Sequence, residues 1–200
     1  AYRWYKKLEY CEMLPILSFK KEVRRPEITI QYELWDNEEM VRQWESKLFN
    51  CFNRYKDFYG GFPQRHRQFW SDKFKTHYYK EFYDYSILAL TDNNEILCYA
   101  FLGQTSMKDN IPRIDILEIS MPEDFIIKDS LFNAIMDFAY RHGLTEVRIQ
   151  LSVQDPHLKW VKKLGFINLW RTNIIGKLFN TIKYFEDIMS EKIDLMRDYQ

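Results

Sequence analysis

The stretch that most restricts the fold is DYSILALTDNNEILCYAFLG, residues 84–103. Two apolar runs flank Asp92, Asn93 and Asn94, and asparagine tolerates the left-handed backbone conformation that tight hairpin turns require. The stretch therefore predicts two antiparallel strands joined by a short turn.

Apolar periodicity predicts further elements on both sides of this hairpin. Strands are expected at 13–23, 28–34, 113–121, 145–153 and 166–175, and helices at 2–9, 36–58, 64–80, 126–143, 155–165 and 179–199. From residue 28 to residue 175 the order of elements is that of one α/β domain.

Several residues predict where the helices begin, end and face the core. Asp36 or Asn37 can cap the helix at 36–58. Its inward face is expected to carry Met40, Val41, Trp44, Leu48 and Cys51. Gly143 and Gly165 are expected to end the helices at 126–143 and 155–165.

Composition excludes some classes of protein. The formal net charge is zero, so no overall attraction to nucleic acid or to anionic lipid is expected. There are 3 cysteines, with no CxxC motif, and no run of 18 apolar residues. The 4 histidines have no metal-ligand spacing. We therefore expect a reduced, cytoplasmic protein without a membrane span or a metal site.

Two segments resemble one known family. ILEISMPEDFIIKDSLFNAIMDFAYRHG (116–143) and SVQDPHLKWVKKLGFI (152–167) are similar to the coenzyme-binding part of GNAT acyl-CoA-dependent N-acetyltransferases. The resemblance covers about residues 28–175. It implies a mixed, mostly antiparallel twisted sheet flanked by helices. It also implies acetyl-CoA as cofactor and a small-molecule or peptide amine as acetyl acceptor.

A repeated phrase extends the resemblance. WVKKLGF (160–166) is echoed by WYKKLEY (4–10), about one domain length earlier. Residues 1–26 therefore resemble the last helix and strand of a preceding GNAT-like unit. Residues 27–176 would form a second unit, and 177–200 an amphipathic helix or a linker to a further domain. A chance match between amphipathic helices is the alternative.

In the tandem-GNAT acetyltransferases that this arrangement resembles, the second unit often carries a YxG…R…W stretch. Tyr59, Gly60, Arg67 and Trp70 are loosely similar to it.

The turn that would hold the coenzyme departs from the family pattern. The resemblance places Ile126 and Lys128 where glycines admit the pyrophosphate, and Glu123 where a basic or amide residue is usual. Asp124 and Asp129 add further negative charge. A helix start is still positive, so weak anion binding stays open.

The other coenzyme-contacting positions that the resemblance implies are Ile119, Met121 and Ser130.

Two candidate catalytic residues follow from the resemblance. Glu118 occupies the place of the base that deprotonates the amine, although a strand carboxylate without a catalytic role is the favoured alternative. Asp115 is expected on the opposite face of the strand. The tyrosine that protonates the coenzyme thiolate corresponds to Val161 here, and to Tyr5 in the earlier phrase. Tyr5 can donate a proton and Val161 cannot.

Three hypotheses follow. The first is a degenerate GNAT-like unit with a structural or acceptor-pocket role in a larger acetyltransferase. The second is an active stand-alone acyltransferase that uses Glu118. The third is an RNA-binding or interaction module, based on the basic and aromatic stretch at 64–80 that contains His66. Nucleic-acid binding is disfavoured, and a homo-oligomer is left open.

Overall fold

A computed structural model describes residues 10–59, 65–75, 83–105, 111–153 and 155–177. The chain divides into two compact units. The larger unit comprises Lys20–Tyr55 and Arg65–Ile149, and the smaller unit contains Gln150–Gln200 together with Ala1–Phe19 and Lys56–Gln64. The predicted helices at 2–9 and 179–199 lie outside the described residues.

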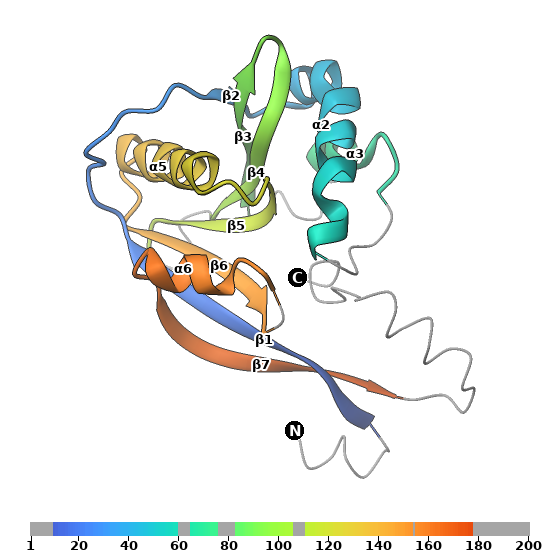
Figure 1. The fold of residues 1–200 in the computed structure, drawn as a ribbon, viewed down its shortest axis with the longest axis vertical. Helices are drawn as coiled ribbons and strands as arrows, with labels where there is room; N and C mark the ends of the chain where they lie inside the picture. Colours follow the sequence, from blue (N-terminus) through green and yellow to red (C-terminus); the bar gives the residue numbers. More distant parts are fainter. Residues whose placement is uncertain (1–9, 60–64, 76–82, 106–110, 154, 178–200) are drawn as a thin grey trace. The chain divides into compact units, whose positions relative to one another are not determined.

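The described elements follow the predicted α/β order (Figure 1). Their bounds are β1 Tyr10–Glu22, β2 Glu33–Trp35, α2 Glu38–Tyr59, α3 Phe69–Lys75, β3 Tyr83–Asp92, β4 Glu95–Thr105, β5 Arg113–Ser120, α5 Phe125–Arg141, β6 Glu146–Ser152, α6 Leu158–Lys163 and β7 Ile167–Lys177. The strands pair in the order β2-β3-β4-β5-β6-β1-β7. The pairs from β2 to β5 are antiparallel, and β5 is parallel to β6. The predicted fold class, a mixed and mostly antiparallel sheet with helices, is confirmed.

The hairpin prediction is confirmed by the register of β3 and β4. Asp92 pairs with Glu95, so Asn93 and Asn94 form the two-residue turn between them. Both asparagines have positive φ, 48° and 65°. This is the conformation of the tight turns that match the twist of antiparallel strands.

A bulge in β5 decides where its side chains point. Leu102 pairs with Ile116 and Phe101 pairs with Glu118, so Leu117 is the extra residue on β5. Directly opposed residues of an antiparallel pair share a face of the sheet. Glu118 therefore lies on the face of Phe101, although Ile116 lies on the face of Leu102.

The bulge also corrects the expected position of Asp115. This residue pairs with Gly103, which is two positions from Phe101 on β4 and therefore lies on the same face of the sheet as Phe101. Asp115 is therefore on the same face as Glu118. The prediction of opposite faces was wrong because it assumed a regular strand.

Helices cover both faces of β4. Its central residues Cys98–Leu102 are all buried, whichever face they occupy. α5 contacts β3 and β4 (Figure 1). On the face that carries Phe101 and Glu118, the Cys51 sulfur of α2 lies 3.9 Å from the Ser120 hydroxyl oxygen. The ring centroid of Trp70 in α3 lies 5.9 Å from that of Tyr99 in β4.

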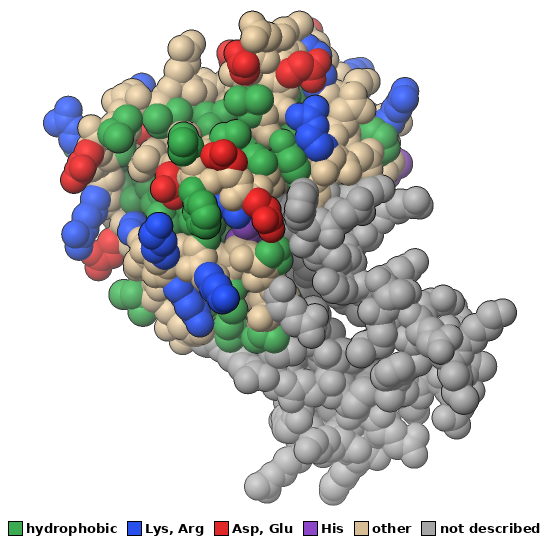
Figure 2. Space-filling view, in the orientation of Figure 1, with side chains coloured by type: hydrophobic (Ala, Val, Ile, Leu, Met, Phe, Trp, Pro, Cys, Tyr) green, Lys and Arg blue, Asp and Glu red, His purple; other side chains and the backbone are tan. Residues whose placement is uncertain are grey.

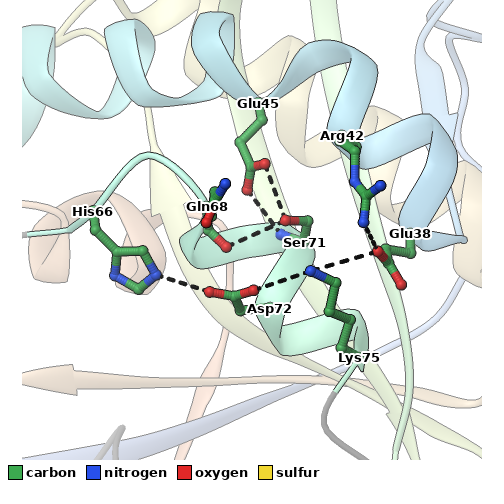
Figure 3. Close-up of polar contacts among 8 residues, drawn as sticks. All are labelled: Glu38, Arg42, Glu45, His66, Gln68, Ser71, Asp72 and Lys75. Atoms are coloured by element: carbon green, nitrogen blue, oxygen red, sulfur yellow. Dashed lines mark hydrogen bonds and ion pairs between the residues drawn. The ribbon is translucent and has the colours of Figure 1, made fainter.

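A buried carboxylate joins α3 to α2 (Figure 3). Glu45 of α2 accepts hydrogen bonds from the backbone N–H and from the hydroxyl of Ser71, both 3.0 Å long. Glu45 and Ser71 are only 6% and 1% exposed. The charge on Glu45 is thus compensated at the start of α3, as a buried carboxylate requires.

A second set of polar contacts around α3 is exposed, and only one of them, between Lys75 and Glu38, reaches α2. Asp72 accepts from His66 at 2.9 Å and from Lys75 at 3.4 Å, and Lys75 also approaches Glu38 (Figure 3). The hydrogen bond from His66 lowers the pKa of the Asp72 carboxyl. Water screens these pairs, so they contribute little to stability.

Helix ends largely follow the sequence signals. The Asn37 side chain accepts from the Met40 N–H at 3.0 Å, which confirms Asn37 as a cap of α2. Gly143 and Gly165 follow α5 and α6 with φ of 67° and 81°, the left-handed conformation that ends helices.

Two predictions in this region were wrong. The strand expected at 28–34 is reduced to Glu33–Trp35, because pairing with β3 begins only at Glu33. Ile28 is 60% exposed. Met40 is 37% exposed, and Val41 is the buried residue of that first turn.

Among the described helices, none combines the length and apolar content that a membrane span requires.

The buried and the exposed contacts of α3 predict different mutational costs. Ser71→Ala removes a hydrogen bond to a buried carboxylate and should lower the free energy of unfolding by about 2 kcal/mol. Asp72→Ala removes only exposed pairs and should change it by less than about 0.5 kcal/mol. Urea denaturation of both variants measures the difference, and equal costs would contradict the assignment.

Candidate functional site

The site is built around Glu118 on β5. The residue is 2% exposed. Its Oε1 accepts from the Tyr99 hydroxyl at 2.5 Å and from the Trp70 indole N–H at 3.2 Å. Its Oε2 accepts from Nη2 of Arg65 at 3.2 Å. The buried carboxylate thus has one cation and two neutral donors as hydrogen-bond partners, as burial of such a group requires.

The three donors come from different parts of the larger unit. Arg65 precedes α3, Trp70 lies on α3, and Tyr99 lies on β4. Glu118 therefore connects α3 with both strands of the β4–β5 pair.

Aromatic rings enclose the cation of this cluster. The Arg65 guanidinium carbon lies 3.9 Å from the centroid of Phe69 and 5.9 Å from that of Phe52. Trp70 makes edge contacts with Phe52, Phe69 and Tyr99, with centroids 5.5–5.9 Å apart. The cluster therefore consists of the Arg65–Glu118 ion pair surrounded by aromatic side chains. Both charged side chains are nearly excluded from solvent.

Burial sets the protonation of the groups around Glu118. Burial, followed by the nearby Glu118 charge, raises the pKa of the Tyr99 hydroxyl well above its usual value. Tyr99 thus keeps its proton and acts as a donor. Burial likewise raises the pKa of the Cys51 thiol to about 12, so Cys51 is not a thiolate nucleophile at neutral pH.

This geometry bears on the predicted catalytic role of Glu118. A general base must come within hydrogen-bond reach of the proton that it removes. Both Glu118 oxygens already accept hydrogen bonds, and the side chain is 3% exposed. The arrangement is that of a carboxylate satisfied by its own protein.

The start of α5, where the pyrophosphate of a coenzyme would bind, is capped by the protein itself. Asp124 Oδ1 accepts from the N–H groups of Ile126 and Ile127 at 2.8 and 3.1 Å. The N–H of Lys128 is bonded to the Asp124 carbonyl at 3.0 Å. The free amides that make helix starts into anion sites are therefore used by a carboxylate. The residues present do not fit the usual pyrophosphate grip.

The side chains at this helix start also differ from those of an anion site. Phe125 and Ile126 are 62% and 78% exposed, and Lys128 is 6% exposed with its ammonium 5.5 Å from the Phe125 ring centroid. Hydrophobic side chains gather on the face that carries α5, with acidic side chains among them (Figure 2). No basic side chain of the turn is displayed to an approaching phosphate.

The remaining coenzyme-contacting candidates do not converge on one surface. Ile119 and Met121 are buried in the core, at 6% and 1% exposure, and Ser130 is half-buried on α5. Tyr5 lies outside the described residues. Val161, in the smaller unit, is buried, so the position of the expected tyrosine is filled by an apolar side chain.

The basic and aromatic stretch at 64–80 is described from Arg65 to Lys75. Trp70 and Phe74 are buried, at 0% and 6% exposure, and so cannot stack on nucleic-acid bases. His66 pairs with Asp72. In the described part of the chain, no group of His, Cys, Asp and Glu side chains has the geometry of a metal site.

Sequence reasoning missed two residues of these two sites, Arg65 and Tyr99, and the contacts of two others, Trp70 and Asp124. Trp70 was noted, but its bond to Glu118 was not, and Arg65 rather than the exposed Arg67 supplies the cation. Nothing in the sequence marked Tyr99 as a polar partner, because it lies within the apolar run of β4. Asp124 did give one, because an aspartate directly before a helix is a preferred cap.

Comparisons with known proteins identify the fold. No protein-family profile and no curated protein sequence matches this chain. Solved structures do match. A GCN5-related N-acetyltransferase from Anabaena variabilis aligns with 88% of this chain at 12% identity and a TM-score of 0.59. One from Sphaerobacter thermophilus aligns with 88% at 12% identity and a TM-score of 0.55.

A third structure is shorter. The ribosomal-protein-alanine N-acetyltransferase from Brucella melitensis aligns over 99% of its own length and 74% of this chain, at 10% identity and a TM-score of 0.53. By contrast, this chain spans only 43% and 57% of the Anabaena and Sphaerobacter proteins. The chain has the fold of the GCN5-related N-acetyltransferase (GNAT) superfamily.

Proposed function

We infer that this chain is a GNAT unit of an N-acetyltransferase, in a protein that transfers an acetyl group from acetyl-CoA to a small-molecule or peptide amine. Its own coenzyme turn is degenerate, and its role is structural or on the acceptor side. The fold supports the superfamily. The observation that carries the role of this unit is the Asp124 carboxylate across the first N–H groups of α5.

The energetics at α5 favour this role over coenzyme binding. A pyrophosphate would have to displace Asp124 from two amides and then lie beside its charge and those of Glu123 and Asp129. Lys128, the basic residue of the turn, is buried. The amides of Ile126, Ile127 and Lys128 are thus already bonded and the basic side chain of the turn is buried, which weakens both contributions to anion binding at a helix start.

The contacts of Glu118 disfavour a stand-alone acyltransferase that uses it as base. The Glu118 side chain is only 3% exposed and its carboxylate already faces Arg65, Trp70 and Tyr99, so an external amine has little access to it. The larger proteins to which this chain is similar are consistent with a unit that works beside another. The tandem arrangement inferred from WYKKLEY and WVKKLGF stays a prediction.

Calorimetric titration of the protein with acetyl-CoA tests the degenerate turn. We expect no binding with a dissociation constant below about 100 μM, because the amides of Ile126 and Ile127 are occupied. Micromolar binding that is abolished by a bulky substitution at Ser130 would show instead that α5 holds the coenzyme.

A stability measurement tests the cap itself. Asp124→Ala should lower the free energy of unfolding by about 1 kcal/mol, the usual cost of losing a helix cap. Glu123→Ala is the matched control: it removes the same charge one position earlier and should cost less than about 0.5 kcal/mol. If the two variants have the same free energy of unfolding, the Asp124 cap does not contribute to stability.

The role of Glu118 is separable from its contribution to stability. Glu118→Gln keeps the shape of the side chain but leaves Arg65 buried without its counter-charge, so unfolding should become easier by about 3 kcal/mol. Below the melting temperature, acetyl transfer by the acetyltransferase that contains this unit should stay within about threefold of the parent. Loss of a general base costs about 100-fold or more, and a fall of that size would assign Glu118 to catalysis.

A further inference from the structure

The surroundings of Arg65 have the chemistry of a receptor for a planar cation. The guanidinium faces the Glu118 carboxylate at 3.2 Å on one side and lies 3.9 Å from the ring centroid of Phe69 on another. Phe52 adds a third wall at 5.9 Å. A buried carboxylate combined with π faces attracts cations, and a guanidinium stacks on rings better than an ammonium does.

The walls of this receptor are held by contacts that do not involve Arg65. Glu118 is oriented by Trp70 and Tyr99, whose hydrogen bonds reach its other oxygen, Oε1. Trp70 also contacts the rings of Phe52 and Phe69 edge-on. The carboxylate and the rings are therefore positioned independently of the cation between them.

The cation and the receptor belong to different elements. Glu118 comes from β5, Phe52 from α2 and Phe69 from α3, whereas Arg65 precedes α3 outside any helix or strand. The Arg65 side chain is 5% exposed, yet the residue as a whole is half-buried. Its backbone thus lies near solvent, and its guanidinium is directed inward. We expect that a shorter side chain at position 65 lets a small cation reach the Glu118 carboxylate from solvent.

We propose that Glu118, Phe52 and Phe69 form a binding site for a guanidinium group, which in this chain is filled by Arg65 as an internal ligand. The site needs no acetyl-CoA and so goes beyond the acetyltransferase function. The internal ligand closes it to external cations. An external guanidinium therefore reaches the same carboxylate and the same ring faces only when the Arg65 side chain is removed.

Replacing the internal ligand by an external one tests the proposal. Arg65→Ala removes Cγ, Cδ and the guanidino group, and ethylguanidinium supplies these same atoms. The variant should melt about 10 °C below the parent, because it leaves a buried carboxylate without its counter-charge. Ethylguanidinium at about 10 mM should raise the melting temperature by several degrees, with saturation that indicates a dissociation constant of about 1 mM.

Three controls separate specific binding from general effects. Ethylurea has the same shape without the charge and should leave Arg65→Ala unchanged. The parent protein, whose site is filled, should not respond to ethylguanidinium. Arg67→Ala removes an exposed arginine two positions away and should neither melt early nor respond to the ligand.

A second variant locates the site. Arg65→Ala with Glu118→Gln lacks the carboxylate charge and should lose the response to ethylguanidinium. If Arg65→Ala alone yields no folded protein, the soluble yield with and without ethylguanidinium answers the same question, and a higher yield supports the proposal. It is overturned by the absence of any gain in melting temperature or yield, by an equal effect of ethylurea, or by a response that survives the loss of the Glu118 charge.

Discussion

The buried negative charge of Glu118 is the constraint on which the arrangement of α3, β4 and β5 depends. A carboxylate removed from water is tolerated only when its oxygens find donors and an opposite charge. Arg65, Trp70 and Tyr99 supply these, and they can do so together only if α3 lies against this pair of strands. The bulge at Leu117 is part of the same arrangement, because it turns Glu118 onto the face that α3 covers.

Two positions that the proposed function assigns to substrate contacts are filled by groups of this chain. At the start of α5, where a pyrophosphate would accept amide hydrogen bonds, Asp124 accepts them. In front of Glu118, where a cationic amine would come close, Arg65 lies within the aromatic rings. Under the proposed function, internal groups of the chain therefore take the places of external ligands. The two contacts have the same physical basis. Asp124 compensates the positive end of the α5 dipole, and Arg65 compensates the charge of Glu118.

Elements whose structure depends on local signals could be predicted from the sequence. The β3–β4 hairpin follows from two asparagines, and the ends of α5 and α6 from Gly143 and Gly165. The strand at 28–34 failed because alternation alone does not bring a partner strand or a helix to cover one face. The contacts of Glu118 could not be predicted either. Arg65 is 53 positions away in the sequence, and its neighbouring residues do not distinguish it from Arg67.

The Arg65–Glu118 pair does more than stabilise the fold. Apolar side chains of similar volume stabilise a core at least as well as a buried ion pair, because they avoid the cost of removing charge from water. A carboxylate with three directional donors, however, accepts only one arrangement of its neighbours, whereas apolar surfaces slide and repack. We therefore attribute to the pair the orientation of α3, a helix of seven residues that is too short to be held by its own hydrogen bonds. The Glu45–Ser71 contact fixes the same helix from the side of α2, so two buried carboxylates on two different elements determine its position.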